Sequence, residues 1–129
     1  MKTKRTARVQ RTGRTLSPRM KVWLEIDGEY VFGHGLNEIL LAVQQAGSIK
    51  EAANLLRKSY RYIWGRIKEA EASLGRQLVT TIVGGAGSQR SALTPLAVRL
   101  STDFVRLRER VAAMVEREFA ERFDVALDD

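Results

Sequence analysis

Alternating apolar and polar residues predict a short β-hairpin near the start of the chain. In the stretch VWLEI, residues 22–26, the aliphatic side chains fall on every second position, which is the period of a strand. Asp27-Gly28 follows, and this dipeptide favours a two-residue type I′ turn because both central residues need positive φ. A second apolar run, YVFG, comes next. We therefore expect a β-hairpin over residues 21–32.

Apolar residues spaced by three or four predict three short helices after the hairpin, over residues 36–45, 48–56 and 59–74. Ser48 suits the N-cap of the second helix, and Glu51 completes a capping box. Ser59 can cap the third. Gly47 and Gly75 suit the ends of the first and third helices. The predicted apolar faces are Leu36, Ile39, Leu40 and Val43, then Ile49, Ala52, Ala53 and Leu56, then Ile63, Ile67, Ala70 and Leu74.

Two strands and a long helix complete the predicted order of elements. LVTTIV (78–83) predicts a strand, and ALT (92–94) predicts a short returning strand after the glycine-rich loop GGAGSQRS (84–91). Thr94 as N-cap and Pro95 at the first helical position begin a helix that runs to about residue 123. This order describes a winged helix-turn-helix, a mainly α fold with little β structure. We expect the domain over residues 19–94 and the long helix within residues 95–129.

The last helix carries an apolar seam with coiled-coil spacing. Its members follow one another at intervals of three and four residues. They are Ala97, Leu100, Phe104, Leu107, Val111 and Met114. A helix of this length cannot bury its whole seam within so small a domain, so we expect its distal half to pair with a second chain in a homodimer. The alternative is that it folds back along its own domain.

The positive charge is concentrated in an N-terminal arm. The chain has a net charge of +7, but residues 1–21 hold eight basic residues and no acid. The other 108 residues hold 14 basic and 15 acidic groups. Like charges repel, so residues 1–18 are expected to be a disordered arm with affinity for polyanions such as nucleic acids. The alternatives are a solubilising tail and an organellar transit peptide.

Cations and aromatic rings lie together on the third predicted helix. On a helical wheel, the arc opposite its apolar face holds Arg61, Gly65, Lys68 and Ala72, bordered by Tyr62 and Trp64. The second helix of a helix-turn-helix enters the major groove of DNA, where Arg and Tyr side chains can reach base edges and phosphates. Gly65 would let a groove wall come close to the backbone.

Simpler explanations exist for several of these side chains. We expect DNA contact from Arg61 and Tyr62, but we expect Trp64 to pack beneath the helix as a support. For Arg66 and Lys68, contact with phosphate and plain solvation are both open. In the loop 84–91, Arg90 would supply a charge to a wing lying along DNA, although the loop could equally be a mere hairpin connection.

Other functional classes find little support in the sequence. Cysteine is absent, which excludes disulfides and thiolate metal sites. The one histidine, His34, has no partners arranged as a triad or ligand set and reads as a loop residue. The loop 84–91 lacks the GxxxxGK[ST] pattern of a nucleotide-binding loop. No run of about 18 apolar residues could cross a membrane. We therefore expect a cytoplasmic protein that is not an enzyme and has no cofactor.

From Gly47 to about Leu107 the sequence resembles the DNA-binding domain of the molybdate-responsive (ModE-type) transcription regulators, which is related to the LysR-type winged helix. The residues that carry this resemblance are GSIKEAANLL, SYRYIW with Ile67 following, and LVTTIVGGAGSQRSALT. The resemblance implies a bacterial or archaeal repressor or activator that is dimeric through its hairpin region and long helix. It also implies operator contacts from Ser59, Tyr60, Arg61 and Tyr62, and from Gly84, Gly85 and Gly87 in the wing.

The resemblance does not extend to a sensor domain. Full-length members carry a pair of small β-barrel modules that bind molybdate, and these have no counterpart before Asp129. We therefore do not expect direct molybdate binding. Two other functions stay open beside a homodimeric regulator that binds double-stranded DNA. One is an architectural or RNA-binding protein driven by the basic arm, and the other is a protein-interaction adaptor.

Overall fold

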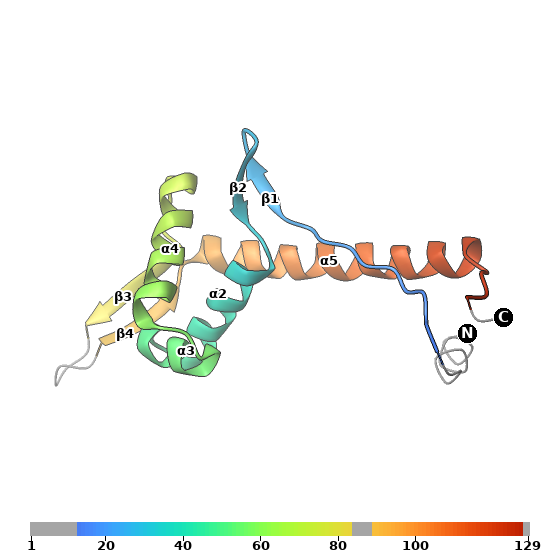
Figure 1. Ribbon diagram of the computed structural model, residues 1–129. Coiled ribbons are helices and arrows are strands. Elements are labelled where there is room, and N and C mark those ends of the chain that lie inside the picture. Colours follow the sequence, from blue (N-terminus) through green and yellow to red (C-terminus); the bar gives the residue numbers. More distant parts are fainter. Residues whose placement is uncertain (1–12, 84–88, 128–129) are drawn as a thin grey trace. The chain divides into compact units, whose positions relative to one another are not determined.

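The computed structural model describes residues 13–83 and 89–127, and Figure 1 shows their helices and strands. Val22–Arg108 form one compact unit, and the described parts of 1–21 and 109–129 form another. The elements are β1 (Leu24–Ile26), β2 (Glu29–Phe32), α2 (His34–Ala46), α3 (Ile49–Leu56), α4 (Tyr60–Leu74), β3 (Val79–Val83), β4 (Gln89–Leu93) and α5 (Pro95–Arg122).

The predicted hairpin is confirmed, but its first strand begins at Leu24 and not at residue 21. β1 and β2 pair antiparallel. The turn residues Asp27 and Gly28 have φ values of 51° and 84°, as a type I′ turn requires. The register shifts after Leu24, which pairs with Phe32.

The corner between α2 and α3 forms where the capping signals place it. Gly47 takes a φ of 86° and its N–H donates to the Val43 carbonyl at 2.8 Å, which ends α2. The Ser48 hydroxyl then accepts the Glu51 N–H at 3.0 Å and starts α3. Because one residue closes α2 and the next caps α3, these two helices meet at a corner without an intervening loop.

The prediction that His34 is a loop residue is wrong. His34 is the first residue of α2, and its Nε2 lies 3.2 Å from Oε2 of Glu38 one turn later. The helix begins two residues earlier than expected because Gly33 serves as N-cap in an extended conformation without any side-chain cap. The usual sequence signal for a helix start is therefore missing here.

One apolar core joins the hairpin, the three short helices, the wing and the beginning of α5. The predicted inner face of α2 is buried in it, as is that of α4 apart from the partly buried Leu74, and Ala52 and Ala53 of α3 are almost fully buried. Their small side chains let α3 cross its neighbours closely. The largest fully buried side chains are Phe32, Phe104, Leu36, Leu40, Ile63, Ile67, Leu78 and Val43.

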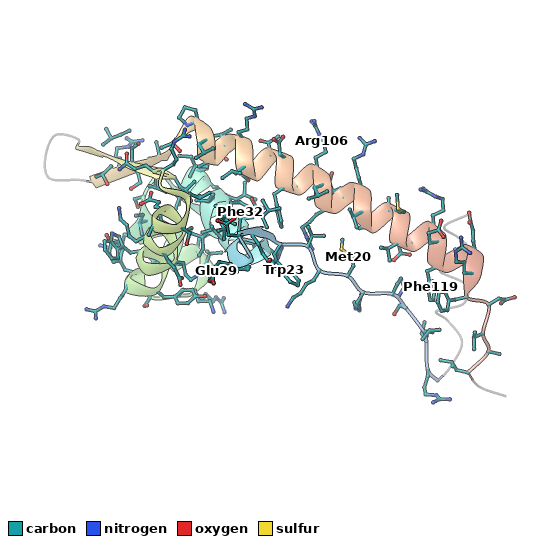
Figure 2. The ribbon with its side chains drawn as sticks, turned by 90° about the horizontal axis from the view of Figure 1, so that it is seen from above. Met20, Trp23, Glu29, Phe32, Arg106 and Phe119 are labelled. Carbon is teal, nitrogen blue, oxygen red and sulfur yellow. The ribbon has the colours of Figure 1, made fainter. Side chains whose placement is uncertain are left out.

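Two phenylalanines join the hairpin to α5 within this core. Phe32 of β2 and Phe104 of α5 meet edge to face, with ring centroids 5.2 Å apart and an interplanar angle of 66°. Both rings are buried, and Figure 2 labels Phe32 in the interior of this unit. Such aromatic pairs contribute about 0.5–1.5 kcal/mol beyond the area that they bury.

The two-stranded wing follows α4. β3 and β4 pair antiparallel from Val79 opposite Leu93 to Val83 opposite Gln89. The prediction that the loop extends to residue 91 is therefore wrong. Gln89, Arg90 and Ser91 belong to β4 and pair with β3. Gly84, Gly85 and Gly87 lie outside the described residues. The wing is also tied to the helices, since the Ser91 N–H donates to the Gly47 carbonyl at 2.8 Å.

The long helix α5 begins as predicted, with the Thr94 hydroxyl accepting the Ala97 N–H at 3.2 Å. It has 28 residues, and in Figure 2 Arg106 extends away from it.

Within the smaller unit, the rings of Phe119 and Phe123 stack with centroids 5.1 Å apart. Arg14 Nη2 donates to the Leu127 carbonyl at 2.8 Å. In the part of the chain that the structure describes, no helix is both long and apolar enough to span a membrane.

Candidate nucleic-acid interface

The first turns of α4 form an exposed surface that is rich in cations and aromatic rings. Ser59 is the N-cap, and its hydroxyl accepts the Tyr62 N–H at 3.0 Å. Tyr60, Arg61 and Tyr62 follow, and all three are exposed. The first turn of the helix contains no acidic residue. The N-terminal end of a helix also carries a partial positive charge, so this end of α4 attracts anions.

Tyr62 is held between two cations of its own neighbourhood. Lys58 Nζ lies 5.5 Å from the centroid of the Tyr62 ring, and Arg66 Cζ lies 5.9 Å from it. Arg66 Nη1 also donates to the Tyr62 hydroxyl at 3.0 Å. These contacts orient the ring, while its exposed part remains accessible to a ligand. For Arg66, phosphate contact and plain solvation were both open. The structure shows another role, which is to support Tyr62.

Gly65 lies on the same side of α4 as the cations. A Cβ built at this position would meet no atom within 4 Å. The fold of the chain therefore does not require glycine here, although glycine costs about 1 kcal/mol relative to alanine inside a helix. The absent side chain leaves space on the outer side of α4, as expected if another molecule approaches the backbone.

The expectation that Trp64 packs beneath α4 is wrong. Trp64 is 44% exposed, and Lys68 Nζ lies 5.6 Å from the centroid of its ring. Lys68 also forms an ion pair with Glu71, with Nζ 3.2 Å from Oε1. The core beneath α4 is already filled by Ile63 and Ile67, so the indole lies at the border of the helix.

A groove of about 790 Å³ connects α4 with the start of α3 and with the wing. Tyr60, Trp64 and Lys68 line it from α4, Lys50 from α3, and Thr81 from β3. Figure 1 shows α3, α4 and the β3–β4 wing gathered in this part of the molecule. Since Glu51 is also among its lining residues, the groove contains both signs of charge.

Other predicted site residues lie apart from α4. Arg90 is exposed on β4, opposite Ile82 of β3. It therefore belongs to the strand of the wing and not to the loop where it was expected. Leu100 and Phe104 lie in the proximal half of α5, and Leu107 is 41% exposed. Met114, in the distal half, is 54% exposed.

Sequence reasoning did not select Lys50. Its place outside the apolar stripe of α3 indicates exposure, but the wheel of one helix does not say which neighbouring helix it faces. Only the packing of α3 against α4 brings Lys50 to the groove that Tyr60 and Lys68 also line.

Residues 36–97 match the family described as "Bacterial regulatory helix-turn-helix protein, lysR family". They form a LysR-type helix-turn-helix domain. This span covers most of α2, all of α3, α4 and the wing, and the start of α5. The site on α4 therefore lies inside the LysR-type domain.

The LysR-type domain is also similar in sequence to a ModE protein. Over 80 residues the chain is 32% identical to "Molybdenum transport protein ModE" of Herbaspirillum seropedicae. The match covers 62% of this chain and 30% of the relative, so the chain spans less than a third of the length of that curated protein. The resemblance to ModE-type and LysR-type domains is confirmed.

Solved structures share the fold of the LysR-type domain. The CbnR DNA-binding domain in complex with DNA is 25% identical, with a TM-score of 0.51, and the match covers 69% of this chain and 97% of that domain. Full-length LysG from Corynebacterium glutamicum with bound effector Arg is also 25% identical, with a TM-score of 0.51. That match covers 67% of this chain and 29% of LysG. The winged helix-turn-helix fold is confirmed.

Proposed function

We propose that this protein is a transcription regulator that binds double-stranded DNA with the first turns of α4. The observation that carries this proposal is the exposed, acid-free N-terminal end of α4, where Arg61 and Tyr62 stand on a capped helix within a LysR-type domain. The CbnR domain, which shares the fold over nearly its whole length, was solved bound to DNA. A regulator of this kind acts in the cytoplasm and performs no catalysis.

Each exposed side chain on α4 has its own part in this proposal. Arg61 reads base edges in the major groove, because a guanidinium can bond guanine O6 and N7 together. Ser59, Tyr60 and Tyr62 contact phosphates or base edges near the start of the helix. Gly65 gives the groove wall room to approach. Arg66 orients Tyr62, to which its Nη1 donates a hydrogen bond.

The wing supplies a second set of contacts to the DNA backbone. Arg90 is exposed on β4, and Gly84, Gly85 and Gly87 belong to the segment that joins the two strands. Glycine-rich segments allow close approach to a phosphate chain, since no side chain intervenes. Contacts of this kind position a protein on DNA without reading its sequence.

Selection of genomic fragments tests the proposed function directly. Purified protein is mixed with sheared bacterial DNA at about 100 mM salt, and the bound fragments are sequenced. We expect one enriched motif, bound about 10³-fold or more tightly than scrambled sequence. Equal affinity for scrambled duplexes would contradict a regulator. If deletion of residues 1–18 then abolished all binding, the architectural or RNA-binding function of the arm would be favoured. No nucleic-acid binding at all would favour an adaptor.

We further propose that the protein acts as a homodimer joined through α5. The seam residues Leu107 and Met114 are exposed in the single chain, and Val111 lies between them on the same helix. Pairing two such seams would bury these three side chains. The predicted seam residues Leu100 and Phe104 already pack on the core of their own domain, where Phe104 meets Phe32. A two-fold dimer would present two copies of α4 to a palindromic site whose half-sites are about 34 Å apart, or a multiple of this distance.

Charged substitutions in the seam should separate the dimer. In sedimentation velocity, Leu107→Lys combined with Met114→Lys is expected to convert dimers to monomers, because it would place two cations from each chain in an apolar interface. Arg106→Ala is the matched control, since Arg106 points away from α5 and lies off the seam (Figure 2). A wild-type protein that sediments as a monomer would contradict the proposed dimer.

A further inference from the structure

The carboxylate of Glu71 lies at the junction between α4 and the wing. Its side chain is only 10% exposed. Oε2 accepts the Leu78 N–H at 2.7 Å and the Val79 N–H at 3.1 Å. Glu71 belongs to the last turn of α4, while Val79 is the first residue of β3. One side chain thus links the end of α4 to the start of the wing.

These two hydrogen bonds fix the start of the wing, where Leu78 and Val79 are also buried in the core. Leu78 precedes the first ladder pair, which is Val79 with Leu93, and the Leu78 carbonyl accepts the Thr94 N–H at 2.9 Å. Leu78 is therefore fixed from one side by Glu71 and from the other by the end of β4. Hydrogen bonds to a carboxylate are stronger than those to neutral acceptors. Glu71 is therefore well suited to fix the orientation of β3 relative to α4.

Lys68 supplies the counter-charge for Glu71. Its Nζ lies 3.2 Å from Glu71 Oε1 and 5.6 Å from the centroid of the Trp64 ring. The ammonium group thus lies between the Glu71 carboxylate, three residues toward the wing end of α4, and the Trp64 ring, four residues toward its first turn. An enclosed carboxylate without a counter-charge would repel any polyanion that binds the adjacent groove, because like charges at short range are unfavourable.

We propose that Glu71 and Lys68 form a latch that fixes the wing against α4, and that Lys68 serves this latch instead of contacting phosphate. Glu71 is a positioning residue, since it acts on DNA through the wing. This proposal rests on the proposed function for its consequence at DNA. It also makes a claim about the free protein that can be tested without any DNA.

Hydrogen exchange of the free protein tests the latch itself. Glu71→Ala is expected to speed the exchange of the Leu78 and Val79 amide protons about tenfold or more, because both lose their acceptor. Glu69→Ala is the matched control, since Glu69 is an exposed acid on the same helix, and it should leave both rates unchanged. Glu71→Gln keeps one acceptor oxygen, so its exchange rates at Leu78 and Val79 should lie between those of the wild type and of Glu71→Ala. Unchanged rates in Glu71→Ala would overturn the latch.

DNA binding then tests the role of Lys68, using the sequence motif selected by the wild-type protein. Lys68→Ala is expected to weaken binding about two- to fivefold, within the range of a partly exposed ion pair. In the Glu71→Gln background, the same Lys68→Ala change should alter affinity by less than about twofold, because no carboxylate remains to be neutralised. A direct phosphate contact would instead persist in that background, with the salt slope falling by about 0.9. That outcome would overturn the assignment of Lys68.

The two experiments fail separately. If the wild-type protein selects no DNA motif, the proposed function fails, while the exchange rates of Leu78 and Val79 still test the latch. If selection succeeds and those rates are unchanged in Glu71→Ala, only the latch fails.

Discussion

Replacing Arg61 and Tyr62 together by alanine is expected to abolish selective DNA binding. The two side chains are exposed at the capped N-terminal end of α4, and each good base contact is worth about 1–3 kcal/mol of discrimination. Affinity for the selected motif should therefore fall about 100-fold or more. Affinity for scrambled duplexes should fall only slightly, because the other basic residues still attract phosphates. Titration of both duplexes by fluorescence anisotropy at one salt concentration measures this.

The double variant needs a control for the lost charge. Arg76→Ala removes one cation just after α4 ends at Gly75, and Arg76 is also exposed. It should change affinity for both duplexes alike and by a small factor. Circular dichroism should show that Arg61→Ala with Tyr62→Ala keeps its helix content. A variant that stays folded and binds the selected motif as tightly as the wild type would place the reading surface elsewhere.

Replacing Phe32 by alanine is expected to cost about 3–5 kcal/mol of unfolding free energy, because it leaves a cavity in the core. Phe32 is 0% exposed and packs edge to face on Phe104. For a domain of this size, each kcal/mol lowers Tm by about 4–8 °C, so the fall should exceed about 10 °C. Thermal unfolding followed by circular dichroism gives the value.

Trp23→Ala is the matched control for this core substitution. Trp23 also belongs to the hairpin region, but about half of its surface is already in solvent. Its replacement should lower Tm much less, since little new cavity forms. A loss of stability that is equal in the two variants would show that the hairpin, and not the core contact with α5, determines the effect.

Local signals explain why much of the fold could be predicted from the sequence. The Asp27-Gly28 turn, the Ser48 and Ser59 caps and the Gly75 helix end depend on residues no more than four positions apart. Such interactions form in much the same way whatever surrounds them. The capped start of α4, which carries the predicted site, was predictable for this reason.

The features that the sequence did not reveal depend on packing between distant segments. The glycine and serine content of 84–91 favoured a loop, but pairing with β3 extends β4 back to Gln89. On the helical wheel, Trp64 lies at the border between the apolar and the cationic face. It is exposed because Ile63 and Ile67 already fill the core beneath α4. The link from Glu71 to Leu78 and Val79 crosses the end of a helix, and no spacing rule predicts it.

The corner at Gly47 has a consequence for how this chain can vary. Gly47 closes α2 with its N–H, precedes the cap of α3, and receives the Ser91 N–H of the wing on its carbonyl. Three elements therefore meet at a single residue, and its left-handed backbone angle suits glycine. An inserted residue at this corner would separate the wing from the helices, so the length of the chain should vary little here.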